Sequence, residues 1–111
     1  MYITLFDTLR KAWIKVPCSA KFEMHGETFV AHKVLETPDG KVRWTVSHKD
    51  TGLSVLHQGY KCRALPTTRA AAVALAKTNL EHRTLEAVKA AVNRGQETLE
   101  ELVAEFGGPQ A

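Results

Sequence analysis

Hydrophobic and polar residues alternate through the middle of the chain, and this alternation predicts an antiparallel sheet. The clearest strand is 41–49, in which Val42, Trp44, Val46 and His48 fall on one side and the intervening residues on the other. Turn sequences bound it, with Thr37-Pro38-Asp39-Gly40 before it and Asp50-Thr51-Gly52 after it. His25-Gly26 separates two further β-rich segments, 21–24 and 27–36, and residues 53–58 follow as a last strand.

These turns predict a pairing register. If Glu36 lies opposite Lys41, then Lys33 faces Trp44 and His32 faces Thr45. If Lys49 lies opposite Gly52, then Trp44 faces His57 and Val46 faces Val55. The core face would then carry Phe29, Ala31, Leu35, Val42, Trp44, Val46, Leu53 and Val55. The opposite face is polar and basic, and we expect it to stay in contact with water.

The first residues favour a helix. Ile3, Phe6, Leu9, Trp13 and Val16 recur at spacings of three and four, with Thr4 as a candidate N-cap. We expect a helix to about Lys15, ended by Pro17. The β-rich segment 2–6 leaves a strand as the alternative start.

Helical character returns after Pro66. Thr67 or Thr68 is a candidate N-cap for an alanine-rich helix, which is either one curved helix of about 27 residues or two helices broken near 82–84. We expect Arg94-Gly95 to end it and Thr98, with Glu101, to cap a last short helix that ends at Gly107. The predicted fold is therefore α+β: an N-terminal helix, a meander of three to four strands, and two to three helices packed on one sheet face.

The 111-residue chain has the length and composition of one domain, which we place at 1–106 with a flexible tail at 107–111. No apolar run is long enough for a membrane span, and charges interrupt the first segment as they would not in a signal peptide, so we expect a cytoplasmic protein. Cys18 and Cys62 form no C-x-x-C pair and are expected to be free thiols.

Catalytic and metal motifs are not found. The histidines do not form an H-x-x-x-H pair and no Cys/His spacing matches a zinc site, so we expect neither a metal nor another cofactor. No G-x-S-x-G motif or phosphate-binding glycine loop occurs, and the later carboxylates are typical of solvated helix faces. We therefore expect a protein that is not an enzyme.

The basic strand face is the candidate binding site. Up to Pro66 there are ten Lys/Arg and six Asp/Glu, whereas five and six follow, so the excess of positive charge belongs to the strand-rich part. Such a face can contact phosphates or an acidic protein surface, or it can simply be solvated. The candidate contact residues are Lys41, Arg43, Thr45, Lys49, Lys61 and Arg63.

The strand Arg43-Trp44-Thr45-Val46 followed by Thr67-Thr68-Arg69-Ala70-Ala71-Ala72 resembles two nucleic-acid-binding domains over residues 27–80. One is the three-strand-plus-helix DNA-binding domain of plant ethylene-response factors and phage integrases, and the other is the double-stranded RNA-binding domain. The latter has a lysine cluster where its final helix begins, and only Arg69 stands there in this chain.

The strand 44–48, the Thr51-Gly52 turn and the Thr/Ala helix also resemble the small accessory proteins of phages and mobile elements, anti-CRISPR proteins among them. This resemblance implies an inhibitor or modulator that acts in the host cytoplasm by occluding a nucleoprotein complex. Direct nucleic-acid binding through the basic face is the alternative. A homodimer through the C-terminal helices is a further expectation.

Overall fold

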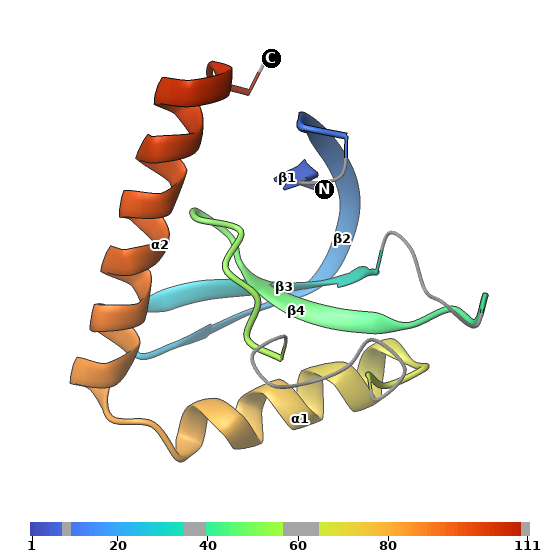
Figure 1. The fold of residues 1–111 in the computed structure, drawn as a ribbon. Coiled ribbons are helices and arrows are strands. Elements are labelled where there is room, and N and C mark those ends of the chain that lie inside the picture. Colours follow the sequence, from blue (N-terminus) through green and yellow to red (C-terminus); the bar gives the residue numbers. More distant parts are fainter. Residues whose placement is uncertain (8–9, 35–39, 57–64, 110–111) are drawn as a thin grey trace.

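The computed structural model describes residues 1–7, 10–34, 40–56 and 65–109 (Figure 1). It is an α+β fold in which a four-stranded antiparallel sheet of order β1-β2-β3-β4 precedes two helices. The elements are β1 (Tyr2–Asp7), β2 (Ala12–Met24), β3 (Glu27–Lys33), β4 (Trp44–His48), α1 (Arg69–Glu81) and α2 (Leu85–Phe106).

The predicted N-terminal helix is wrong: these residues form β1 and the first half of β2. Ile3 pairs with Val16 across this hairpin, and both are buried, while Tyr2 pairs with Pro17 on the exposed side. In the strands the apolar residues instead divide by a period of two, with Ile3 and Leu5 on the side of Ile14 and Val16 and with Phe6 and Trp13 on the other side. Pairing with β2 decides between them, because it satisfies the backbone of a segment rich in β-branched and aromatic residues.

A bulge bends β2 and so sets the shape of the sheet. The β2–β3 register shifts between Ser19 and Phe22, and Ala20 within the bulge has φ of 54°. The first half of β2 pairs with β1 and the second half with β3, and the strand curves strongly between them (Figure 1). The β1–β2 hairpin therefore arches over one face of β3 and β4.

The predicted register of the meander is confirmed where the structure describes it. Lys33 pairs with Trp44 and His32 with Thr45, and the amide of Val55 donates to the carbonyl of Val46. The His25-Gly26 turn is also confirmed, since both residues have positive φ, 53° and 75°, as a type I′ hairpin requires. The partners Glu36 and His57, with the turn residues 37–39, lie outside the described residues.

The face of the sheet that packs on the helices, here called the helix face, contains the main core. Phe29, Ala31, Val46 and Val55 are buried there as predicted, against Ala72, Ala76 and Leu80 of α1. Small alanine side chains let α1 lie close under the strands (Figure 1). Trp44 and Leu53 are only half-buried, Val42 is exposed contrary to the prediction, and Leu35 lies outside the described residues.

The opposite face, here called the hairpin face, does not stay in contact with water, contrary to the prediction. The β1–β2 hairpin covers it, and a second cluster forms there from Ile3, Val16, Cys18 and Val30. The curvature of β2 is the physical reason, because a strand alternation says which side chains share a face but not which faces are covered. Cys62 lies outside the described residues.

Of the two alternatives for the helical region, two helices with a break at 82–84 are confirmed. Thr68 and Thr84 cap α1 and α2 by accepting from the amides of Ala71 and Ala87. The predicted end at Gly95 and the cap at Thr98 are wrong, because α2 continues to Phe106 and the Thr98 hydroxyl donates to the carbonyl of Arg94 within the helix. Gly95 instead lets α2 lie close to the turn after β4, because a Cβ at this position would lie only 3.2 Å from Thr51 Oγ1.

The C-terminal end of α2 is attached to the β1–β2 hairpin by aromatic contacts. Phe106 lies against Phe6 at a ring distance of 5.0 Å, and Phe6 lies edge-on to Trp13. The Trp13 indole Nε1–H donates to the carbonyl of Gly107 at 2.8 Å. Helix α2 thus extends from α1 to the hairpin along the side of the sheet (Figure 1).

Candidate binding site

The sequence-predicted contact residues do not form one surface. Thr45 is 3% exposed on the hairpin face and cannot meet a partner, so its assignment is wrong. Lys41 and Lys49 are exposed but lie beyond opposite ends of β4, and half-buried Arg43 donates from Nη1 to the Leu65 carbonyl at 2.9 Å. Lys61 and Arg63 lie outside the described residues.

A buried polar network explains why Thr45 and its neighbours face inward. His32 Nδ1 lies 3.0 Å from the Lys33 carbonyl, which only accepts, so Nδ1 carries the proton. In the neutral ring, Nε2 then accepts from the Ser47 hydroxyl at 2.7 Å, and the hydroxyls of Thr45 and Ser54 lie 3.3 Å apart. These groups satisfy one another beneath the β1–β2 hairpin, so their burial costs little.

The Ser47–His32 pair has the hydrogen bond of a nucleophile and its base, but its position is that of a structural pair. Ser47 and His32 are 2% and 4% exposed, and a substrate carbonyl would have to reach Ser47 through the covering hairpin. We assign this pair to the core.

The structure gathers positive charge at the end of the sheet where β3 ends and β4 and α1 begin. Lys33 Nζ lies 5.8 Å from the centre of the Trp44 ring, across the β3–β4 pair. The amide of Trp44 donates to the Pro66 carbonyl, which brings the start of α1 to the same end, and there the guanidinium of Arg69 donates to Ser19. We call this surface the cationic end; its members are Lys33, Lys41, Arg43, Trp44 and Arg69.

Acidic residues lie elsewhere in the described chain. Glu23 and Glu27 flank the β2–β3 turn, Asp50 follows β4, and Glu81 ends α1, all at the opposite end of the sheet from the cationic end. The remaining described carboxylates belong to Asp7, Glu86, Glu97, Glu100, Glu101 and Glu105. The first four carboxylates therefore lie away from the cationic end, and the opposite end carries both signs, with Lys49 next to Asp50.

Apolar surface accompanies the charge at this end. Val42 is 55% exposed and Trp44 is half-buried. An aromatic ring beside cations can stack on a base or cover an apolar anchor of a protein partner. The sequence analysis placed Trp44 on the core face, and the indole does pack against the main core, but it is only partly buried and Lys33 lies over it, as the predicted register set these two residues opposite each other.

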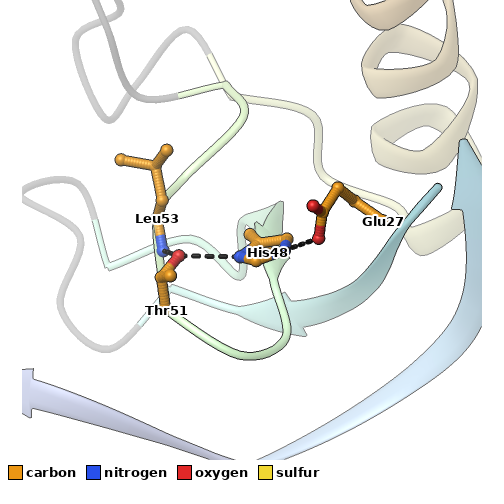
Figure 2. Close-up of polar contacts among 4 residues, drawn as sticks. All are labelled: Glu27, His48, Thr51 and Leu53. Carbon is orange, nitrogen blue, oxygen red and sulfur yellow. Dashed lines mark hydrogen bonds and ion pairs between the residues drawn. The ribbon is translucent and has the colours of Figure 1, made fainter. Parts of the chain in front are cut away.

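The opposite end of β4 carries a separate polar cluster. His48, which is 2% exposed, donates or accepts at both ring nitrogens: Nε2 lies 2.7 Å from Glu27 Oε2, and Nδ1 lies 2.8 Å from Thr51 Oγ1 (Figure 2). Thr51 Oγ1 also accepts from the Leu53 amide at 3.2 Å. These bonds hold the turn after β4 against the start of β3.

No protein-family model matches the sequence, and comparisons with curated proteins and with solved structures give no significant match. Within the described residues, neither helix combines the length and the apolar character that a membrane span requires.

Proposed function

We propose that this protein is a non-catalytic binding protein whose cationic end docks on an acidic macromolecular surface, as an inhibitor or modulator of a nucleoprotein complex would. The observation that supports it is Lys33 lying over the half-buried Trp44 at the end of the sheet that also carries Lys41 and Arg69, with Glu23, Glu27, Asp50 and Glu81 at the opposite end. Such a group of cations orients a protein in the field of an acidic partner and raises its association rate.

One member of the cationic end also holds the fold. Arg43 donates to Leu65, and its replacement would free the segment before α1. The test therefore uses Lys33 and Arg69, which are exposed at the rim. Arg69 is the first residue of α1, where glutamate is favoured by the helix dipole, so Arg69→Glu leaves the helix stable.

The experiment compares two charge-matched double variants. Lys33→Glu with Arg69→Glu changes the cationic end, and Lys49→Glu with Lys89→Glu makes the same change in net charge elsewhere. Partners captured from the host lysate by the wild-type chain are identified by mass spectrometry, and their affinities are then measured with purified proteins. We expect the first pair to weaken binding at least tenfold and the second to leave it within about twofold. Equal loss in both pairs would show an effect of net charge alone and would reject the cationic end as the site.

Direct nucleic-acid binding through the same end is the second candidate, and Trp44 is the observation that favours it. A labelled duplex and a labelled single strand are titrated at several salt concentrations. Contact with about three phosphates predicts a log–log slope near −3 for the duplex. Stacking on Trp44 predicts tighter binding of the single strand and its loss in Trp44→Leu. Absence of binding at low salt eliminates this candidate and leaves the acidic protein partner.

A further inference from the structure

The register of β3 and β4 gathers three metal-ligating side chains at the end of the sheet opposite the cationic end. Phe29 pairs with His48, and the Lys49 amide donates to the Thr28 carbonyl, so the start of β3 lies beside the turn after β4 that contains Asp50. Glu27 and His48 share the helix face, because Glu27 and Phe29 are two residues apart on β3 and Phe29 lies opposite His48. A ligand atom of each lies within 4.8 Å of those of the other two.

We propose that Glu27, His48 and Asp50 form a binding site for a divalent first-row transition ion, of which Zn²⁺ is the representative. Ligands around a tetrahedral zinc with bonds of about 2.0 Å lie about 3.3 Å apart, so the oxygens and the nitrogen must move by about 1.5 Å or less. Asp50 is exposed and Glu27 half-buried, so both can move by side-chain rotation. One imidazole and two carboxylates leave a fourth position for water.

The carboxylates of Glu27 and Asp50 repel each other, because their oxygens lie within 4.8 Å. Within the described chain Asp50 has no ion pair with a lysine or arginine, and Glu27 is paired only with the imidazole of His48. A bound cation would remove this repulsion. The imidazole favours a transition ion over Mg²⁺ or Ca²⁺, which prefer oxygen ligands alone.

His48 is held in the orientation that such a site requires. Metal-binding histidines usually donate their second ring N–H to a fixed acceptor, and Thr51 Oγ1 lies 2.8 Å from Nδ1. The Leu53 amide donates to the same oxygen and fixes its position (Figure 2). The hydroxyl can serve both states of the ring, as a donor to Nδ1 or as an acceptor from Nδ1–H.

Metal binding therefore implies a change of tautomer. Without an ion, Nε2–H donates to the Glu27 carboxylate at 2.7 Å, and Nδ1 accepts from Thr51. With an ion, Nε2 is a ligand: it gives its proton to water while Nδ1 gains one from water, so the ring stays neutral and Nδ1–H donates to Thr51 Oγ1. Nitrogen-15 chemical shifts of the His48 ring distinguish these states, because a protonated and an unprotonated ring nitrogen have different shifts.

The test titrates the full-length chain with zinc chloride by isothermal calorimetry. We expect one ion per chain, loss of at least tenfold in affinity in Asp50→Asn and in Glu27→Gln, and no change in Glu23→Gln, an exposed control at the same hairpin. Glu27→Gln retains an acceptor for His48. Should it fail to fold, the exposed Asp50→Asn still decides the question.

Thr51→Val tests the role of the hydroxyl, because loss of such an outer partner typically weakens metal binding about 10-fold to 100-fold. Thr51→Ser should restore the affinity. Absence of zinc binding to the wild-type chain, or binding that Asp50→Asn and Glu27→Gln leave unchanged, overturns the proposal. An unaltered His48 nitrogen spectrum at saturating zinc overturns it equally.

Discussion

Replacement of Gly95 by alanine tests whether this glycine is needed for close packing of α2 on the turn after β4 or is merely tolerated within the helix. A glycine in the middle of an exposed helix is about 1 kcal/mol less favourable than alanine, so the substitution alone would stabilise α2. Here the new Cβ would lie 3.2 Å from Thr51 Oγ1, 3.3 Å from Thr51 Cβ and 3.6 Å from Leu53 Cβ. Overpacking of this kind typically costs about 1–3 kcal/mol.

The sign of the change in the free energy of unfolding depends on whether Thr51 can move away from the new methyl group. The hydrogen bonds of Thr51 to His48 and to the Leu53 amide oppose such a movement. We therefore expect overpacking to dominate, with a net loss in the free energy of unfolding of about 1 kcal/mol. With a urea m-value of about 2 kcal/mol/M, the midpoint of urea unfolding falls by about 0.5 M. Asn93→Ala, at an exposed position of the same helix, is the control and should stabilise by a few tenths of a kcal/mol. A raised midpoint in Gly95→Ala would refute the close packing of α2 on the turn.

Three further predictions concern stability. Leu80→Ala creates a cavity beside the sheet and should cost about 2–5 kcal/mol by urea unfolding; Leu85→Ala, at a 46% exposed leucine, should cost less than 1 kcal/mol. Thr84→Ala removes the N-cap of α2 and should cost about 1 kcal/mol, with recovery in Thr84→Ser; an unchanged midpoint would contradict the cap. Trp13→Phe removes the hydrogen bond to Gly107 and should cost about 0.5–1.5 kcal/mol, read out by faster amide exchange in the last turn of α2 than in its first.

The sequence allowed the local parts of the fold to be predicted. The turn sequence Thr37-Pro38-Asp39-Gly40, with Glu36 placed opposite Lys41, was sufficient to predict the β3–β4 register, because a hairpin turn of known length leaves one pairing. The caps at Thr68 and Thr84 are local as well. Gly95 shows the limit: a glycine that ends a helix and one that admits a neighbouring loop look alike until the neighbour is known.

The sequence could not predict that the β1–β2 hairpin covers the polar face of the sheet. Alternation placed Thr45 and Ser47 on the polar face correctly, yet both are buried because the bend at Ala20 carries the β1–β2 hairpin over them. A polar face is normally evidence of solvent contact, and here hydrogen bonds to His32 and Ser54 take the place of water. The candidate binding surfaces in the structure therefore lie at the two ends of β4, whereas the sequence analysis placed the contact surface along its middle.

Both proposed sites follow from one register, and they can be tested separately. The Lys33–Trp44 pair closes one end of the β3–β4 ladder and the Phe29–His48 pair closes the other, so a shift of one residue would abolish both arrangements at once. Their chemistry is nevertheless independent, because the cationic end and the three metal ligands share no side chain. Loss of partner binding in Lys33→Glu with Arg69→Glu should leave zinc affinity unchanged, and loss of zinc binding in Asp50→Asn should leave partner affinity unchanged. Failure of both functions in either variant would indicate a disturbed ladder rather than a lost contact.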